Sequence, residues 1–477
     1  MIPARLEAFD SLDPHAAEPL YRQIYDRYLR AMATGALRPG DRIPSARALA
    51  KELGLARGTV ETAYSLLAAE GYVQPRGQAG TMVTPGLKLR VPAPAPATAP
   101  PGARPPLQAF LDTPPGPLPP FQMGLPALDA FPRKTWARLG ARCWRMTQAE
   151  ELAYPPVQGS LALRNAIAAY LQVSRGISCS AAQVFITSGY RQTLDLAGRA
   201  LWKAGDRIWM EDPGYPPTRE LLQHAGFQAV PVPVDHDGLI VSAGEKAAPR
   251  ARAAVVTPAH QSPLCVSLSL PRRLALLDWA SRAGAWILED DYDGEYRYVS
   301  RPLPALKSLD RDGRVLYAGT FSKVLFPGLR LAYLVVPESL VPQFLQASQV
   351  FSARAPLHSQ SIVTAFMAEG HFGRHIQRMR KLYAERRAAA AAGLAAVLGK
   401  AGTIAPQPGG MHLVLRLRNG LHDAEIAQRM REQGLYAQAL GDWTRATPAD
   451  SALLLNFTNI ASQAGAEKLG RRMLALF

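Results

Sequence analysis

Apolar residues recur every three or four positions in three short segments near the start of the chain, over residues 18–34, 45–54 and 57–70. This spacing places the apolar side chains on one face of a helix. Ser45 is a favourable N-cap for the second segment, and Gly54 is a typical residue at a helix end. We therefore predict three helices, the last two joined by a tight turn.

The third of these helices is predicted to bury an apolar stripe, formed by Val60, Ala63, Tyr64 and Leu67. After it, residues 71–83 have the pattern of two short apolar strands around a glycine-rich turn. Helix, turn, helix and hairpin together form a winged helix-turn-helix, whose second helix presents its first residues to the major groove of DNA. A small helical protein-interaction domain is the alternative interpretation.

Proline interrupts the pattern between residues 85 and 120, where thirteen prolines occur. Proline fixes φ and removes a backbone donor, so this stretch is predicted to be a stiff, extended linker. A Pro-rich recognition ligand is the weaker alternative. The chain is thus predicted to have a winged helix-turn-helix DNA-binding domain over 1–84, a Pro-rich linker over 85–120 and one large domain over 121–477.

In the large domain, short apolar runs alternate with helical patterns. This alternation is typical of an α/β domain with a mainly parallel central sheet. Neither common glycine-rich nucleotide-binding fingerprint occurs in the chain. The predicted strands cover residues 184–187, 207–210, 253–257, 285–288, 314–317 and 331–336.

The amino-acid composition excludes several classes of protein. The 477 residues are 48% hydrophobic and 19% charged, with a net charge of +16. These values exclude collagen, coiled-coil and disulfide-scaffold proteins, and the basic excess is compatible with a polyanionic partner. Three scattered cysteines indicate neither a disulfide framework nor a metal site. No apolar stretch has the length of a membrane span or of a signal peptide, so we expect a cytoplasmic protein without a membrane partner.

The winged-helix segment carries a family resemblance. Residues 37–83, LRPGDRIPSARALAKELGLARGTVETAYSLLAAEGYVQPRGQAGTMV, closely resemble the winged helix of GntR-type bacterial regulators. Glu61 departs from the neutral or basic residue that would suit the DNA-facing side. The resemblance implies contacts to double-stranded DNA from Arg47, Arg57, Gly58, Thr59, Arg76 and Gly77.

Polar clusters follow several predicted strands of the large domain, where α/β proteins bind ligands. Their order, and above all the motif GTFSK…GLRLAY, resembles the fold-type I aminotransferases that bind pyridoxal 5′-phosphate (PLP). A winged helix fused to such a domain is the arrangement of the MocR/GabR subfamily of regulators. The resemblance implies a fold-type I PLP-dependent transferase domain.

The resemblance also implies roles around the cofactor ring. Lys323 would hold PLP as a Schiff base, and Asp290 would pair with the ring nitrogen. Tyr292 would hydrogen-bond the phenolic oxygen, and Tyr215 would stack on the ring face. His260 and Gln261 would line the edge of the ring.

The cofactor phosphate is expected at the start of a helix, where free backbone N–H groups bind anions. By resemblance, Tyr154 of a neighbouring subunit would reach the same phosphate, so the site would be complete only in a homodimer, head to tail. The remaining phosphate-binding residues would be Ser188, Gly189, Tyr190, Ser322 and Arg330.

Three positions depart from the family pattern. Cys265 stands where a glycine is common, and Arg191 stands where glutamine is frequent. The run 453–460 has no arginine, although aminotransferases often anchor the substrate carboxylate there. Candidates for a replacement are Arg219, Arg354 and Arg416.

These observations favour a PLP-dependent transcription regulator. An amino-compound effector would act at Lys323 and change the binding of paired DNA half-sites. A catalytically active aminotransferase with an accessory DNA-binding domain is the alternative, and weak transamination is compatible with both. A third hypothesis is a sensor of PLP itself.

Overall fold

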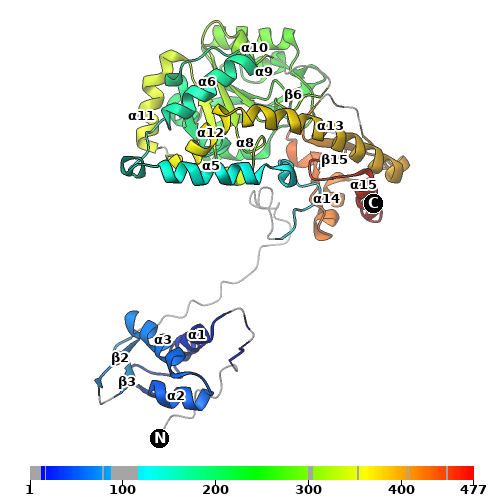
Figure 1. The fold of residues 1–477 in the computed structure, drawn as a ribbon. Coiled ribbons are helices and arrows are strands. Elements are labelled where there is room, and N and C mark those ends of the chain that lie inside the picture. Colours follow the sequence, from blue (N-terminus) through cyan, green and yellow to red (C-terminus); the bar gives the residue numbers. More distant parts are fainter. Residues whose placement is uncertain are drawn as a thin grey trace. The chain divides into compact units, whose positions relative to one another are not determined.

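The structure is a computed structural model that describes residues 12–14, 16, 18–77, 80–87, 116–298, 304–351, 354–404, 407, 409–446 and 450–477. The chain forms two compact units, Met1–Arg104 and Pro105–Phe477 (Figure 1). Residues 88–115, the greater part of the predicted linker, lie outside the described residues.

The first unit contains the three predicted helices and the hairpin, which confirms the winged helix-turn-helix. The hairpin strands β2 and β3 pair with each other, and the two-residue strand β1, which sequence reasoning missed, pairs with β3. Ser45 accepts a hydrogen bond from Ala48 N and caps α2, as predicted. The elements are α1 (Leu20–Ala33), β1 (Arg42–Ile43), α2 (Ala46–Leu53), α3 (Arg57–Ala69), β2 (Val73–Pro75) and β3 (Thr81–Val83).

The second unit is built on an eight-stranded sheet with the order β4-β11-β10-β9-β8-β5-β6-β7. The five central strands from β10 to β6 are parallel, and β11 runs antiparallel to both of its neighbours. All six predicted strands are present. The strands are β4 (Val184–Thr187), β5 (Arg207–Asp212), β6 (Gln228–Asp235), β7 (Gly238–Leu239), β8 (Ala253–Val256), β9 (Trp286–Asp291), β10 (Val315–Thr320) and β11 (Ala332–Val335).

Strand β6 was missed because its sequence, QAVPVPVD, contains two prolines. Pro231 and Pro233 are two positions apart, so their nitrogens point to the same side of the strand. Strand β6 pairs with β5 on one side, and on the other it pairs with β7 only at Val234 and Asp235. Proline has no backbone N–H, so it is tolerated along an edge of a strand where few N–H groups are needed to pair with a neighbouring strand.

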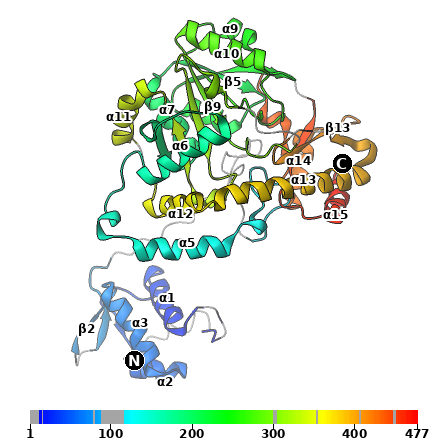
Figure 2. The same cartoon turned by 45° about the horizontal axis from the view of Figure 1, so that its top comes forward.

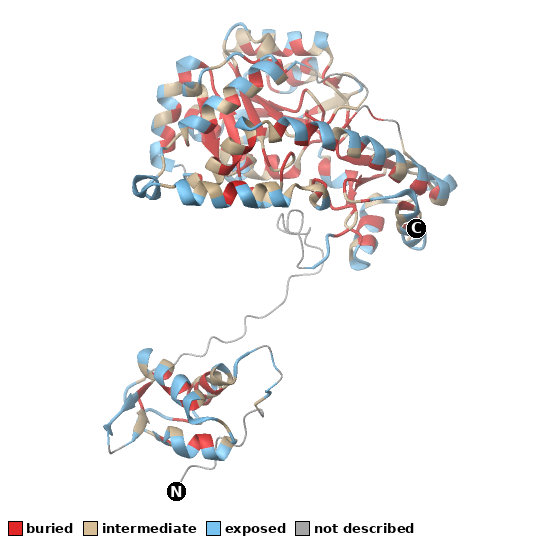
Figure 3. Ribbon diagram, in the orientation of Figure 1, coloured by how far each residue is buried: buried red, intermediate tan, exposed pale blue. Residues whose placement is uncertain are grey.

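Helices cover the central sheet, and their buried residues face the strands while their outer faces are exposed (Figures 2 and 3). Within the described ranges, no helix combines the length and the apolar character needed to cross a membrane. The helices of this part are α5 (Arg133–Met146), α6 (Leu161–Arg175), α7 (Tyr190–Leu201), α8 (Pro216–His224), α9 (Val241–Ala247), α10 (Leu270–Ala283), α11 (Val341–Phe351) and α12 (Leu357–Ala368).

The C-terminal part adds a four-stranded antiparallel sheet with the order β12-β13-β15-β14. The long helix α13 connects the two sheets: Phe372 and Ile376 pack in a core cluster of the large sheet, whereas Met379 and Leu394 pack in the C-terminal core. The elements are α13 (His371–Leu398), β12 (Gly402–Ile404), β13 (His412–Leu417), α14 (Asp423–Glu432), β14 (Gln438–Ala439), β15 (Ala452–Asn456) and α15 (Gln463–Leu474).

Candidate functional site

A cavity of about 400 Å³ lies at the carboxyl ends of the parallel strands. One wall comes from the ends of β9 and β10 and the loops after β5 and β8, and the facing wall comes from the C-terminal sheet. This is the position in which open α/β sheets bind ligands. The predicted site residues that line it are Gly189, Tyr190, Tyr215, Asp290, Tyr292, Ser322, Lys323 and Arg330.

Lys323 follows strand β10 and extends its amine into the cavity. Its Nζ atom donates a 2.9 Å hydrogen bond to the carbonyl oxygen of Gly124. Burial lowers the pKa of Lys323 from its ordinary value, although the carboxylates of Asp290 and Asp293 act in the opposite direction. A lowered pKa increases the fraction of neutral amine, the form that reacts with carbonyl compounds.

Asp290 lies near the end of β9 and is buried, and its carboxyl group makes no hydrogen bond to any residue that the structure describes. Burial raises its pKa well above the ordinary value, and the nearby acids Asp291 and Glu211 raise it further. A buried acid without a partner, facing a cavity, is suited to a ligand that supplies a hydrogen bond or a positive charge.

An anion site is built where α7 begins. Gly189 is the N-cap of this helix and has φ +127°, a conformation that side chains disfavour. A Cβ atom on Gly189 would lie 3.4 Å from Nη2 of Arg330. The free N–H groups at the helix start, the Ser322 hydroxyl and the Arg330 guanidinium therefore form one cradle of donors.

Aromatic side chains close one side of the cavity. The ring of Tyr215 lies 5.6 Å from that of Trp443 and 6.1 Å from that of Tyr190. The hydroxyl groups of Tyr190 and Thr218 share a 2.8 Å hydrogen bond. These contacts hold the Tyr215 ring at the cavity, where a flat ligand could stack on it.

Three predicted residues lie behind the lining. The Nδ1 atom of His260 lies 3.1 Å from the Tyr292 hydroxyl and 3.0 Å from an oxygen of Asp293. The amide of Gln261 donates to the backbone oxygens of Pro213 and Ser262, and the amide oxygen of Gln192 accepts from the N–H of Ser188. These residues support the cavity walls rather than forming them.

Sequence reasoning missed a large part of the lining. Thr257, Ser262 and Thr320 belong to motifs that pointed to the site, so their signal was present. Residues of the segment before α5 and of the C-terminal sheet have no local signature, because only the tertiary fold brings them to the cavity. They are Gln122, Met123, Gly124, Leu125, Met411, His412, Gln438 and Trp443.

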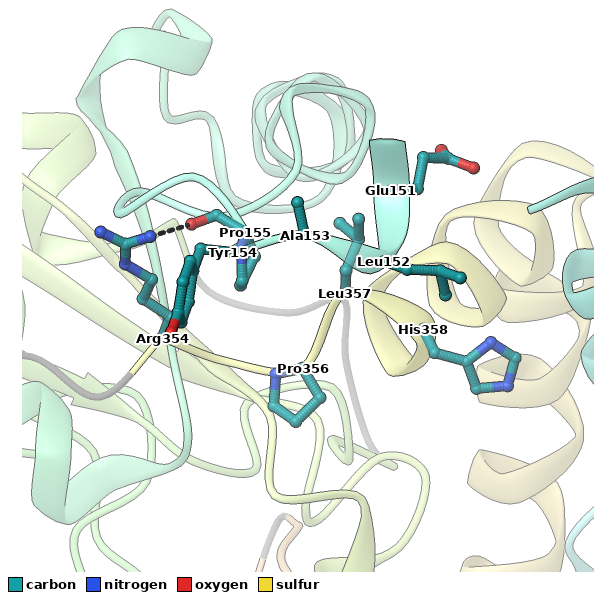
Figure 4. A pocket seen from close by; sticks show the side chains of 9 residues that line it. All are labelled: Glu151, Leu152, Ala153, Tyr154, Pro155, Arg354, Pro356, Leu357 and His358. Atoms are coloured by element: carbon teal, nitrogen blue, oxygen red, sulfur yellow. Dashed lines mark hydrogen bonds between the residues drawn. The ribbon is translucent and has the colours of Figure 1, made fainter. Parts of the chain in front are cut away.

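None of the three arginines considered as acid-group anchors lines the cavity. Arg219 is buried on α8, and Arg416 is exposed and pairs with Asp450. Arg354 lies on a surface hollow, where its guanidinium is 5.7 Å from the centre of the Tyr154 ring and donates to Pro155 O (Figure 4). Tyr154 is 90% exposed and does not contribute to the cavity of its own chain.

The predicted DNA-contacting residues lie on the surface of the first unit. Arg47, Arg57, Gly58, Arg76 and Gly77 are exposed, and Thr59 is half-buried. Arg57 opens α3, and its Nε atom forms a 2.8 Å ion pair with Glu61 one turn further on. The departure noted at Glu61 therefore has a structural role, because it orients and partly neutralises Arg57.

Comparison with known proteins agrees with both units. Residues 20–83 match the family of bacterial regulatory proteins, gntR family, and residues 131–454 match aminotransferase class I and II. The probable rhizopine catabolism regulatory protein MocR of Rhizobium meliloti is 37% identical over 456 residues, which cover 94% of this chain and 92% of that protein. The chain belongs to the MocR-type family of transcriptional regulators.

Other relatives support the same assignment. The MocR-type chain is 33% identical to the HTH-type pyridoxine biosynthesis transcriptional regulator PdxR of Corynebacterium glutamicum, over 94% of each chain. Its second unit is similar to the crystal structure of the α-aminoadipate aminotransferase LysN from Thermus thermophilus, complexed with N-(5′-phosphopyridoxyl)-L-leucine. That match has a TM-score of 0.67 and 28% identity and covers 75% of this chain and 92% of LysN. The fold-type I prediction is confirmed.

Proposed function

We propose that this MocR-type protein is a PLP-dependent regulator, in which an amino-compound effector binds at the Lys323 cavity and changes the affinity of the winged helix for DNA. The observation that carries the proposal is the presence, in one chain, of a winged helix and a cavity that unites a half-buried lysine amine, an anion cradle and an acid that makes no hydrogen bond to any described residue. The protein acts in the cytoplasm, where its DNA partner is found.

The residues of the cavity fit PLP. Bound PLP supplies an electrophilic aldehyde carbon and an electron-withdrawing ring. Lys323 would be the covalent attachment point, Asp290 would pair with the ring nitrogen and Tyr215 would stack on the ring; all three residues line the cavity. Ser188, which belongs to the same turn as Gly189, shapes the phosphate cradle through its bonds to Gln192.

A primary amine on the effector would exchange with the Lys323 amine at the aldehyde carbon of the cofactor, which would free the lysine side chain. Lys323 follows β10, whereas Gly124, its hydrogen-bond partner, precedes α5 and adjoins residues held by the C-terminal sheet. Release of Lys323 would therefore break a contact between the loop after β10 and the segment that Asn456 of the C-terminal sheet holds. Regulation requires that the effector prefer one arrangement of these walls, by ~1–3 kcal/mol in typical allosteric proteins.

A homodimer completes the site in this proposal. Tyr154 lies in an apolar surface region in which Trp144, Met146 and Leu152 are also more than half exposed. Head-to-tail association would cover this region and place Tyr154 at the phosphate cradle of the partner. Two winged helices per dimer predict two DNA half-sites.

The test begins with selection of genomic DNA fragments by the full-length, PLP-loaded protein at physiological salt. The dissociation constant of the enriched fragment is then measured with a panel of primary amines and amino acids. We expect paired half-sites in the footprint and a change in affinity of about 5-fold or more with at least one compound. A protein that enriches no fragment, or whose DNA affinity no amine changes, contradicts the proposal.

A working aminotransferase is the second candidate, because Lys323, Asp290 and Arg330 line one cavity. The 2-aminoadipate transaminase of Thermus thermophilus is 29% identical over 361 residues, which cover 74% of this chain. Multiple turnovers of an amino donor to its keto acid, with no effect of that donor on DNA binding, would favour this candidate. Regulation predicts at most slow turnover together with a change in DNA affinity.

A further inference from the structure

The C-terminal sheet contributes polar side chains to the cavity that also contains Lys323 and Asp290. His412 begins β13, is 3% exposed and lines the cavity together with Gln438 of β14. In the sheet register, His412 lies beside Asn456 and Gln438 lies beside Leu454 of β15. Strand β15 has the sequence ALLLN and contributes no cationic side chain to this wall. The polar side chains His412 and Gln438 come from the neighbouring strands β13 and β14.

The hydrogen bonds of His412 determine which of its ring nitrogens is available. Its Nε2 atom lies 2.9 Å from the carbonyl oxygen of Pro263, which can only accept, so Nε2 carries a hydrogen. The same atom lies 3.2 Å from Sγ of Cys265. The Nδ1 atom has no hydrogen-bond partner within the described ranges, which leaves it to a ligand in the cavity.

Cys265 favours the charged form of this imidazole. The residue has φ +63°, a conformation natural to glycine, which accounts for the glycine common at this position in the family pattern. Burial acts to raise the pKa of the Cys265 thiol, but His412 and His260 lower it to about 6. Burial acts to lower the pKa of the His412 imidazole, but the neighbouring Cys265 acts in the opposite direction, and this pKa is raised from its ordinary value. A thiolate beside the ring stabilises an imidazolium, whose Nδ1–H is a charge-assisted donor.

Gln438 adds a neutral donor to the same wall. Its Oε1 atom accepts a 3.2 Å hydrogen bond from Nε1 of Trp443, which fixes the orientation of the amide and leaves its NH₂ group to donate. The arginines that line the cavity, Arg191 and Arg330, belong to the start of α7 and to the cradle beside it. The wall contributed by the C-terminal sheet thus has its own anion-binding donors, separate from that cradle.

We propose that His412, backed by Cys265 and assisted by Gln438 on the same wall of the cavity, binds the acid group of the effector. The inference rests on the proposed function and specifies the effector class: a compound with a primary amine at one end and a carboxylate or sulfonate at the other. Simple amines, which lack the acid group, bind more weakly.

The test compares matched ligands on the full-length, PLP-loaded protein. β-Alanine is paired with ethylamine, and 4-aminobutanoate is paired with propylamine, so that each pair differs only in the acid group. Affinity is read from the change in the visible absorption of the cofactor. We expect the wild type to prefer the acid of at least one pair by about 10-fold or more, as a charge-assisted hydrogen bond predicts. His412→Phe is expected to reduce this preference to within about twofold.

Control variants separate this role from others. His422→Phe makes the same substitution at an exposed histidine of the C-terminal part and is expected to retain the preference. Cys265→Ala is expected to lose part of the preference for the acid, because the thiolate that stabilises the His412 imidazolium is absent from this variant. A preference that survives in His412→Phe overturns the inference, and its loss in Arg191→Gln instead assigns the acid group to Arg191.

A second readout does not depend on the reaction of an amine. In protein with ¹⁵N-labelled histidine, the signals of His412 are assigned by comparison with His412→Phe, and propanoate is added. Movement of the Nδ1 signal supports the inference, and no movement at saturating propanoate overturns it. If no amine changes the cofactor absorption, the proposed function fails, and this titration still decides the role of His412.

Discussion

The imidazole of His375, on α13, donates a 2.9 Å hydrogen bond from Nε2 to the carbonyl oxygen of Val324, the residue after Lys323. The hydroxyl of Tyr296 donates to the carbonyl oxygen of Lys323 itself, at 3.3 Å. The buried side chains of His375 and Tyr296 therefore fix the backbone at Lys323 and Val324. This arrangement positions Lys323 before any ligand enters.

The bond at His375 predicts a pH-dependent stability. Burial lowers the pKa of His375 from 6.5 to about 4, so the folded protein keeps this ring neutral. The unfolded chain takes up a proton near pH 6.5, so the stability from His375 is present above that pH and is lost as pH falls towards 4. This difference corresponds to ~3 kcal/mol in the free energy of unfolding.

The measurement is urea unfolding of wild type and His375→Gln at several pH values between 7.5 and 4. The glutamine amide retains a donor for Val324 O but does not titrate. The wild type is expected to lose more stability than the variant over this range, whereas the exposed control His422→Gln follows the wild type. A constant difference between wild type and His375→Gln would refute the assignment.

Substitution of Lys323 by alanine is expected to abolish covalent attachment of PLP. After borohydride reduction, mass spectrometry should find one cofactor adduct per wild-type chain and none in Lys323→Ala. Arg330 and the start of α7 are unchanged in this variant, so we expect PLP to bind non-covalently. Lys381→Ala, at an exposed position of α13, should keep the adduct. A reducible adduct in Lys323→Ala rules out this lysine.

The ion pair on α3 predicts opposite effects of its two members on DNA binding. Arg57→Ala is expected to weaken binding about 10-fold and to reduce the salt slope by about one, because one phosphate or guanine contact is lost. Glu61→Gln is expected to strengthen binding several-fold, because the carboxylate no longer repels phosphate or competes for Arg57. Affinities are compared at matched salt with Arg282→Ala, which removes the same charge from the second unit. Unchanged affinity of Arg57→Ala would exclude α3 as the reading helix.

A buried ion network beside Asp290 predicts a large loss of stability. Arg175 contacts Asp291 at 2.5 Å and Glu295 at 2.9 Å, and all three side chains are buried. Removal of the cation leaves two buried carboxylates, which typically costs ~3–5 kcal/mol. Arg175→Met should therefore lower the midpoint of thermal unfolding far more than Arg199→Met, whose pair with Asp195 is exposed. Adding Asp291→Asn and Glu295→Gln to Arg175→Met should recover part of the loss; no recovery would argue against the network.

Periodic patterns and ordered motifs determined much of this protein at the level of sequence. The 3.6-residue period of Val60, Ala63, Tyr64 and Leu67 predicted α3, because one helix face must be buried whatever the rest of the chain does. Lys323 was assigned through a resemblance, because the continuous motif GTFSK…GLRLAY is similar to that of the fold-type I aminotransferases. Local signals of this kind need no knowledge of distant residues.

Tertiary structure alone decided which residues meet. His412 and Cys265 are 147 positions apart and touch only because the C-terminal sheet closes over the loop after β8. Tyr154, in contrast, lies outside the cavity of its own chain although its motif pointed to the cofactor. The ionisation of Lys323, Asp290 and Cys265 follows from burial and from neighbours distant in sequence, and no period or motif encodes these.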